Sequence, residues 1–222
     1  MDLWLFVPLV MTGLALATGG LDKLSAITGG VMGYMVLFTG GTDWLVLLVI
    51  FFAFSMSATG YKYSTKSKYG LSQKKRAVEN VLGNGLVPLA FAMQGNLYGF
   101  AAALATATAD TMSSEIGVLS KDAPVSVLDF KTKVKRGENG GVSTLGNAMM
   151  VAGSLAIATA CLFLFGTWQL FWVTLWAGVF GTILDSVLGA TLENEGVIGN
   201  HLVNLFSTLG SGVMAIALVS FF

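Results

Sequence analysis

The feature that most constrains the fold is a series of apolar runs, most of them close to the length that crosses a bilayer. Short polar or glycine-rich segments separate these eight runs, whose approximate bounds are 3–18, 24–39, 44–59, 81–95, 97–119, 142–165, 169–190 and 201–221. Because 55% of the residues are hydrophobic and only 11% are charged, the composition excludes an ordinary soluble domain. We predict one all-α integral membrane domain over residues 1–222, a polytopic transmembrane helical bundle of about eight spans. The shorter runs are candidates for re-entrant segments.

The basic residues predict the orientation of this bundle. If the first run crosses from the outside inward, all 12 Lys and Arg residues lie on the inner side or in inner connections. Since cytoplasmic loops of membrane proteins are enriched in Lys and Arg, this arrangement predicts cytoplasmic basic loops at 60–80 and 120–141 and both termini outside. We interpret the basic cluster at 62–76 as a determinant of topology and of attraction to lipid headgroups. The formal net charge is zero, so we expect no binding of nucleic acid.

Polar residues interrupt the runs at the ends that this topology places on the inner side. Asp110, Ser114 and Gly117 are spaced at i, i+4 and i+7, so an acid, a hydroxyl and a gap share one helical stripe. Glu115 follows in the same run, and Asp185 lies near the end of the seventh run. A carboxylate inside a span costs roughly 2.5–3.5 kcal/mol on insertion scales. Helix packing through small residues is the alternative, but it explains neither Asp110 nor Glu115.

Two pairs of asparagines begin the fourth and eighth runs, and the members of each pair are four residues apart. The pairs are Asn80 with Asn84 and Asn200 with Asn204. Amide groups can bind a metal ion or a phosphate without adding charge. N-capping explains Asn80 and Asn200 equally well, whereas Asn84 and Asn204 are one turn deeper, where no cap is needed. We expect these amides and the acids to converge at the inner end of the bundle.

The end of the 120–141 loop has features of a phosphate site. Basic residues as far as Arg136 lead into a turn with Gly140 and Gly141, and Ser143 begins the next apolar helix. The N–H groups of such a turn, a helix N-terminus and adjacent Lys or Arg side chains recur where proteins bind phosphate. The spacing is not that of a Walker A motif. A solvated loop that follows the positive-inside rule is the competing interpretation.

Four segments carry a resemblance to a known family. They are Ala-Asp-Thr-Met-Ser-Ser-Glu-Ile-Gly at 109–117, Gly-Glu-Asn-Gly-Gly-Val-Ser at 137–143, Leu-Asp-Ser-Val-Leu-Gly-Ala-Thr at 184–191 and Val-Asn-Leu-Phe-Ser-Thr at 203–208. From about Lys62 onward the chain resembles the phytyl-phosphate kinase family of integral membrane proteins. The resemblance implies Mg²⁺-dependent transfer of the γ-phosphoryl group of a nucleoside triphosphate, with CTP as the expected donor, to a prenyl monophosphate.

The resemblance agrees with the interpretation of the residues themselves. We expect Mg²⁺ to be held, directly or through water, by three acids: Asp110, Glu115 and Asp185. With Asn84 and Asn204, these acids form the predicted catalytic set. The residues predicted to bind nucleotide or acceptor phosphate are Asn80, Ser114, Lys135, Arg136, Gly140, Gly141 and Ser143. The prenyl tail is expected between helices, with its phosphate at the inner interface.

Two other functions fit the same residues. A cation- or proton-coupled transporter also uses paired intramembrane acids and broken helices, but the outer halves of the last four runs are nearly all Ala, Leu, Val, Phe and Gly. A CTP-dependent lipid cytidylyltransferase would use the same site and release pyrophosphate. A purely structural membrane protein is the remaining class.

The expected partners are a prenyl monophosphate, a nucleoside triphosphate and membrane lipids. The oligomeric state stays open, with a homodimer as one option.

Overall fold

A computed structural model describes residues 3–19, 21–71 and 78–221 of the chain. Each of the eight predicted runs coincides with one long helix to within a few residues. These helices are α1 (Val7–Thr18), α2 (Lys23–Gly40), α3 (Thr42–Gly60), α5 (Val78–Met93), α6 (Leu97–Gly117), α7 (Thr144–Phe165), α8 (Trp168–Leu188) and α9 (Asn200–Val219). The prediction of an all-α membrane bundle is therefore confirmed.

Hydropathy distinguishes these helices from one another. Within the described ranges, four helices are long and apolar enough to cross a membrane: α3, α7, α9 and α8 with its continuation. α1 and α5 are apolar but shorter. α6 is long, but it carries the polar segment that the sequence analysis singled out, and the bundle surrounds it.

Short elements occupy the two predicted basic loops. The first loop contains the helix α4 (Tyr63–Lys68), and the second contains the strands β1 (Val125–Ser126) and β2 (Gly141–Val142). The strands pair antiparallel, with Val125 opposite Val142. Two further short elements are η1 (Leu3–Phe6) and the π-helical turn η2 (Gly189–Glu193) that continues α8. The predicted basic residues Lys74, Lys75 and Arg76 lie outside the described residues.

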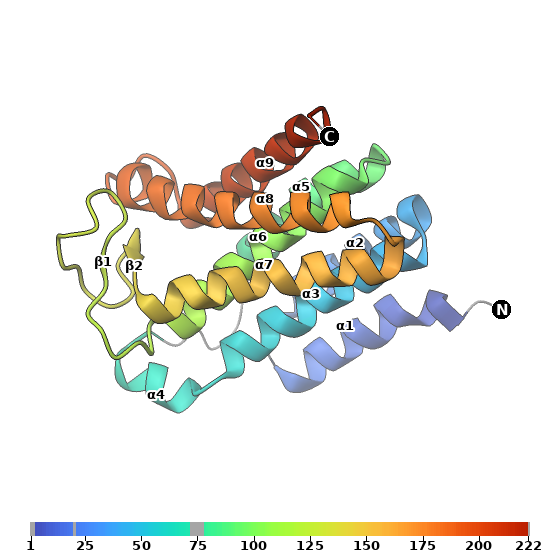
Figure 1. Cartoon of the computed structure of the whole chain (residues 1–222). Helices are drawn as coiled ribbons and strands as arrows, with labels where there is room; N and C mark the ends of the chain where they lie inside the picture. The colour runs from blue at the N-terminus through green and yellow to red at the C-terminus, as the bar shows by residue number, and fades with distance from the viewer. Residues whose placement is uncertain (1–2, 20, 72–77, 222) are drawn as a thin grey trace.

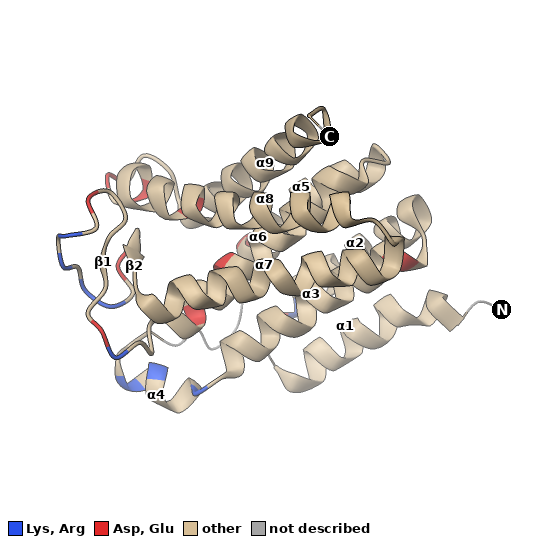
Figure 2. Ribbon diagram, viewed as in Figure 1, with Lys and Arg blue, Asp and Glu red and all other residues tan. Residues whose placement is uncertain are grey.

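The elements alternate between the two ends of the bundle. Figure 1 shows both chain termini at one end and α4, β1 and β2 at the other. The Lys and Arg residues drawn in Figure 2 gather mainly at the end that carries α4 and the strand-bearing loop. This geometry matches the alternation that the charge pattern predicts. We call this end the basic end.

α6 is the central helix and packs against α3, α5, α7, α8 and α9. All residues from 99 to 109 are buried, and their small side chains let neighbouring helices approach closely. A Cβ atom added at Gly153 of α7 would lie 2.7 Å from the Cα atom of Ala109, and one at Gly178 of α8 would lie 2.8 Å from the Cβ atom of Ala105. The small-residue interpretation is therefore correct for this part of α6, whereas the acids follow it toward the basic end.

Candidate active site

The segments that the sequence analysis singled out line one polar cavity at the basic end. The cavity encloses about 2020 Å³ of space, including its open mouth. Its walls come from the first turns of α5 and α9, the last turns of α6 and α8, η2 and the turn at 137–141. Eleven of the twelve predicted site residues line it, and these are Asn80, Asn84, Asp110, Ser114, Glu115, Arg136, Gly140, Gly141, Ser143, Asp185 and Asn204. Lys135 is exposed and does not line the cavity.

Asp110 of α6 and Asp185 of α8 form the acidic centre of the cavity. Both side chains line the cavity, and they lie close enough for the two carboxylates to repel each other. Asp185 is only 9% exposed, and its Oδ2 atom accepts a hydrogen bond of 2.9 Å from the Ser207 hydroxyl. Two carboxylates at such close range are compatible only when a proton or a cation compensates their repulsion. This pair is therefore the position where a cation fits.

The asparagine pairs meet because α5 and α9 approach closely. A Cβ atom at Gly83 would lie 2.8 Å from the His201 carbonyl oxygen and 3.4 Å from the Cβ atom of Asn204. Asn84 and Asn204 are both buried at this contact. The Nδ2 atom of Asn84 donates to the Asn80 carbonyl at 3.1 Å, so its amide oxygen and its second N–H group are left to bind a ligand.

The capping explanation for the outer members of these pairs is wrong. Asn80 lies inside α5, which begins at Val78 in the described residues, and the N-cap of α9 is Gly199. Both asparagines instead line the cavity. His201, which follows Asn200, also lines it and is exposed.

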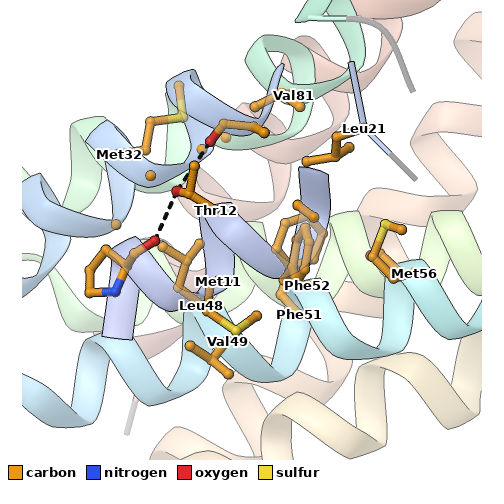
Figure 3. A pocket seen from close by; sticks show the side chains of 18 of the residues that line it. Met11, Thr12, Leu21, Met32, Leu48, Val49, Phe51, Phe52, Met56 and Val81 are labelled. Atoms are coloured by element: carbon orange, nitrogen blue, oxygen red, sulfur yellow. Dashed lines mark hydrogen bonds between the residues drawn. The ribbon is translucent and has the colours of Figure 1, made fainter. Parts of the chain in front are cut away.

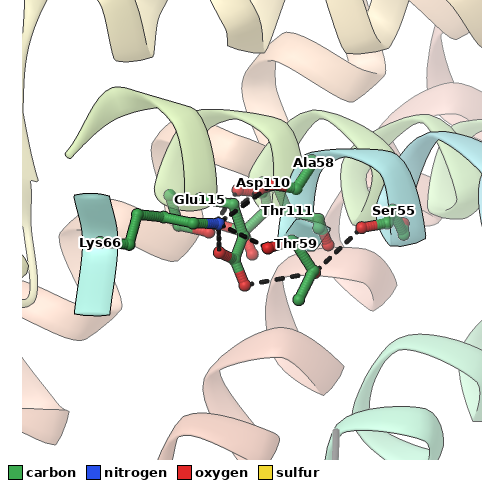
Figure 4. A network of polar contacts seen from close by, with 8 residues as sticks. Ser55, Ala58, Thr59, Lys66, Asp110, Thr111 and Glu115 are labelled. Atoms are coloured by element: carbon green, nitrogen blue, oxygen red, sulfur yellow. Dashed lines mark hydrogen bonds and ion pairs between the residues drawn. The ribbon is translucent and has the colours of Figure 1, made fainter. Parts of the chain in front are cut away.

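Glu115 has a partner that the sequence analysis did not identify. Its Oε2 atom lies 2.6 Å from the Nζ atom of Lys66, as Figure 4 shows. Lys66 is completely buried and also donates to the carbonyl oxygens of Ala58 at 3.1 Å and Thr59 at 2.7 Å. The Thr59 hydroxyl donates to Glu115 at 3.3 Å. The interpretation of the 62–76 cluster as headgroup-binding is therefore wrong for Lys66, which is an internal residue.

The three acids predicted to hold Mg²⁺ directly or through water differ in their surroundings. The described residues contain no group of three or more His, Cys, Asp or Glu side chains placed to hold one metal ion. Lys66 neutralises Glu115 and holds it, which leaves Asp110 and Asp185 as the acidic pair. This pair fits Mg²⁺, because Mg²⁺ in phosphate-handling sites takes one or two protein carboxylates and fills its other positions with water and phosphate oxygens.

Arg136 lies at the cavity wall, but main-chain acceptors occupy its guanidinium. Its Nη1 atom donates to the carbonyl oxygens of Val118 at 3.0 Å and Ser120 at 2.5 Å, and its Nη2 atom donates to the main-chain carbonyl oxygen of Asp122 at 3.4 Å. These carbonyl groups follow the end of α6 and have no helical partners of their own. Arg136 thus anchors the loop to α6, and its role as a phosphate ligand stays a prediction.

The glycine turn and the start of α7 close the cavity. Gly140 has a positive φ of 75°, and a Cβ atom there would lie 2.8 Å from the Cα atom of Ala190, so the turn requires glycine to pack on η2. Ser143 caps α7 by accepting from the Gly146 N–H at 3.1 Å, and it donates to the Gly117 carbonyl at 3.1 Å. The turn at 137–141 therefore lines the same cavity as the acids.

Asp122 holds the other side of the same loop. Its Oδ2 atom accepts from both the N–H and the hydroxyl of Thr144 at 2.9 Å, and the Ser120 hydroxyl donates to its Oδ1 atom. These bonds, first that from Ser120 and then those from Thr144, hold the pKa of the Asp122 carboxyl well below its usual range. Asp122 therefore stays ionised at neutral pH and tethers the loop to the start of α7.

The cavity is acidic overall. Six carboxylates line it, and they belong to Glu79, Asp110, Glu115, Glu138, Asp185 and Glu193. Among the described residues, Arg136 is the single lysine or arginine in the lining. An acidic cavity of this kind attracts cations, and a polyphosphate can enter it only together with cations that offset the repulsion.

Sequence comparisons identify relatives across nearly the whole chain. The model of the family described as integral membrane protein DUF92 matches residues 6–212. An uncharacterised membrane protein of Methanocaldococcus jannaschii is 31% identical over 202 residues, which cover 88% of this chain and 84% of the relative. Protein PGR of Arabidopsis thaliana is 30% identical over 210 residues, covering 77% and 72% of the two chains.

An uncharacterised membrane protein of Synechocystis is 30% identical over 197 residues, which cover 81% of this chain and 74% of the relative. No solved structure matches the chain. The family model spans the first seven long helices and α9 as far as residue 212, so the match includes all the residues that line the polar cavity. The chain therefore belongs to the DUF92 family of integral membrane proteins.

Proposed function

We propose that this protein is a prenyl monophosphate kinase. It would transfer the γ-phosphoryl group of CTP to a phytyl- or geranylgeranyl-type monophosphate and release the prenyl diphosphate. The observation that carries the proposal is that Asp110 and Asp185 line one cavity together with buried amides and a glycine turn. The basic end would face the cytoplasm, where the nucleotide is available, in agreement with the positive-inside rule.

The residues of the cavity suit phosphoryl transfer because this reaction needs positioning and charge neutralisation more than covalent help from the protein. An oxygen of the acceptor monophosphate would attack the γ-phosphorus of CTP, the bond from that phosphorus to the β–γ bridging oxygen would break, and CDP would leave. The attacking oxygen is already ionised, so no strong general base is required. A chain with a single histidine can therefore carry out this reaction without a histidine base.

Each group in the cavity has a defined part in this proposal. Asp110 and Asp185 would hold Mg²⁺, which neutralises phosphate charge when it is bound. The amides of Asn84 and Asn204 would donate hydrogen bonds to phosphate oxygens or complete the metal's oxygen shell. N–H groups of the turn at 137–141 would hold the donor phosphates. Glu115 would not touch the metal, because Lys66 holds its carboxylate.

The acidity of the cavity favours a second candidate, a cation-coupled transporter. Six carboxylates and one arginine in the lining are typical of a cation site. A transporter also needs a polar path to the opposite face, however, and α6 is buried continuously from 99 to 109 by tightly packed neighbours. The kinase therefore fits better. A cytidylyltransferase would use the same cavity and differs in its products.

A product assay distinguishes these functions. Purified protein in detergent is incubated with geranylgeranyl or phytyl monophosphate, Mg²⁺ and either CTP or ATP, and the lipid and nucleotide products are resolved. Prenyl diphosphate and the nucleoside diphosphate are expected in equal amounts. Pyrophosphate with a CDP-lipid would identify a cytidylyltransferase, and no turnover with any pair would contradict the kinase and direct the next test to cation transport.

Replacing one member of the acidic pair tests the site itself. Asp110→Asn removes a charge from the pair, and we expect the rate of transfer to fall by at least about 100-fold, the order expected when a major electrostatic contribution is removed. The matched control is Asp43→Asn, which changes an exposed acid in the first turn of α3 at the opposite end of the bundle. The control should keep its activity, and the elution of both variants from a size-exclusion column should be unchanged. Full activity in Asp110→Asn would contradict the proposed site.

A further inference from the structure

A second cavity, which is almost entirely apolar, lies between α1, α2, α3 and the start of α5. Figure 3 shows Met11, Met32, Phe52 and Met56 around it. This apolar groove encloses about 870 Å³ of space, including its open mouth. The Thr12 hydroxyl in its wall already donates to the Pro8 carbonyl at 2.8 Å, so it adds little polarity. Flexible Met and flat Phe side chains of this kind adapt to an irregular hydrocarbon.

The apolar groove and the polar cavity share a lining residue, Asn80. α5 contributes only Asn80, Val81 and Gly85 to the groove, so Asn80 marks the end of the groove nearest the basic end. Along α3 the lining extends from Leu45 to Met56, a length of about 16 Å at the helical rise of 1.5 Å per residue. A ligand with a polar head in the cavity could therefore extend a tail of several isoprene units along the groove.

A buried hydroxyl near the junction also indicates a ligand with a polar part. Ser55 lines the groove one residue before Met56, the end of its α3 wall, and its Oγ atom has no hydrogen-bond partner among the described residues. Ser55 is 3% exposed. Buried polar groups normally have partners, and the ester oxygen of a phosphorylated chain would supply an acceptor here.

We propose that the apolar groove binds the isoprenoid tail of the acceptor, and that the phosphate passes Asn80 into the polar cavity. The inference rests on the proposed function and adds the place and the chemistry of substrate recognition. The occupant is a single methyl-branched hydrocarbon chain that ends in a monophosphate. A single-chain amphiphile fits because one apolar groove joins one polar cavity at a single residue.

Gly29 of α2 allows a direct test. It lines the groove, and a Cβ atom added there has no heavy atom within 4 Å. A leucine at this position can therefore be accommodated by the helix and would fill groove space. The matched control is Gly13 of α1, which also has open space around an added Cβ atom but is exposed and does not line the groove.

The first experiment measures KM and kcat for monophosphates of 10, 15 and 20 carbons with wild type, Gly29→Leu and Gly13→Leu. Gly29→Leu should raise KM for the 20-carbon acceptor by at least tenfold. Lost or blocked methylene contacts in an apolar pocket change the discrimination between substrates of different chain length by roughly 10- to 200-fold. KM for the 10-carbon acceptor should change little, and Gly13→Leu should match wild type. The same change at all chain lengths, or the same effect in both variants, would overturn the proposal.

A second experiment does not require turnover. A geranylgeranyl monophosphate analogue with a diazirine on its tail is photolysed with the wild-type protein, and the labelled peptides are identified by mass spectrometry. Label is expected on α1 and α3 near Met11 and Phe52, and unlabelled geranylgeranyl monophosphate should displace it while phosphatidylglycerol does not. Label elsewhere, or equal displacement by the phospholipid, would overturn the groove assignment. Label in the groove without turnover would contradict the kinase alone, and turnover with label elsewhere would contradict the groove alone.

Discussion

The ion pair between Lys66 and Glu115 is the least exposed charge contact described in this protein, with side-chain exposures of 1% and 10%. The attraction between two buried ions offsets their loss of hydration only when further hydrogen bonds satisfy both ions. Here Ala58 and Thr59 supply the acceptors for Lys66, and the Thr59 hydroxyl supplies a donor to Glu115. The pair joins the corner between α3 and α4 to the end of α6 and so sets one wall of the cavity.

Removing one partner should therefore destabilise the fold. We expect Lys66→Met to lower the free energy of unfolding by about 3–5 kcal/mol, because it leaves Glu115 buried without a counter-charge. The double variant Lys66→Met with Glu115→Leu should lose less than the sum of the two single variants. Lys68→Met is the control, because Lys68 is exposed two residues away. Equilibrium unfolding in mixed micelles measures these values, and additive losses would show that the two side chains act independently.

At the scale of elements, the close packing of α6 depends on residues without side-chain bulk on the helices around it. Gly153 of α7 lies directly against the backbone of Ala109, and Gly117 lies against Gly146 at the end of the same interface. Asp110 directly follows Ala109, and Glu115 lies two residues before Gly117. The spacing of α6 and α7 therefore controls where Asp110 lies relative to α8.

Gly153→Ala tests this packing. The new Cβ atom would lie 2.7 Å from backbone atoms of Ala109, so α6 and α7 must separate, and we expect a loss of about 1–3 kcal/mol in the free energy of unfolding. Gly13→Ala is the control, since it makes the same substitution in a helix with open space around the new atom and should be neutral or slightly stabilising. Thermal unfolding in detergent measures both variants, and equal unfolding temperatures would contradict the packing argument.

At the scale of the whole molecule, the two ends of the bundle differ in charge and in architecture. The basic end carries α4, the strand-bearing loop and the polar cavity, whereas the opposite end carries both termini and short connections. The positive-inside rule predicts that the basic end lies in the cytoplasm. The orientation proposed for the active site depends on this placement.

Cysteine labelling tests the orientation. The single native cysteine, Cys161, is buried, so it should give little background with a membrane-impermeant maleimide. Leu128→Cys is at an exposed position between the strands, and Thr167→Cys is exposed in the connection between α7 and α8. In intact cells we expect Thr167→Cys to react and Leu128→Cys to react only after the membrane is permeabilised. The reverse pattern would place the cavity outside the cytoplasm.

Local properties of the sequence were sufficient to predict the helices and the residues that gather at the cavity. A run of apolar residues forms a helix in a membrane because its backbone must satisfy its own hydrogen bonds there, and the α6 prediction of 97–119 agrees with the observed Leu97–Gly117. The acids and amides were found because polar groups inside such runs are costly. Both signals depend only on residues that are neighbours in the chain, so they can be recognised from the sequence without a structure.

The partners of these polar groups were decided only by the tertiary structure. Lys66 and Glu115 are 49 residues apart, and Ser207 and Asp185 are 22 residues apart, so no spacing rule joins them. The sequence predicts Glu115 as a metal ligand and Arg136 as a phosphate ligand. Only the packing shows that Glu115 pairs with a buried lysine and that Arg136 donates to the carbonyl groups at the end of α6. Hydropathy and charge are properties of single residues and short segments, whereas the choice of a partner depends on how the whole bundle closes.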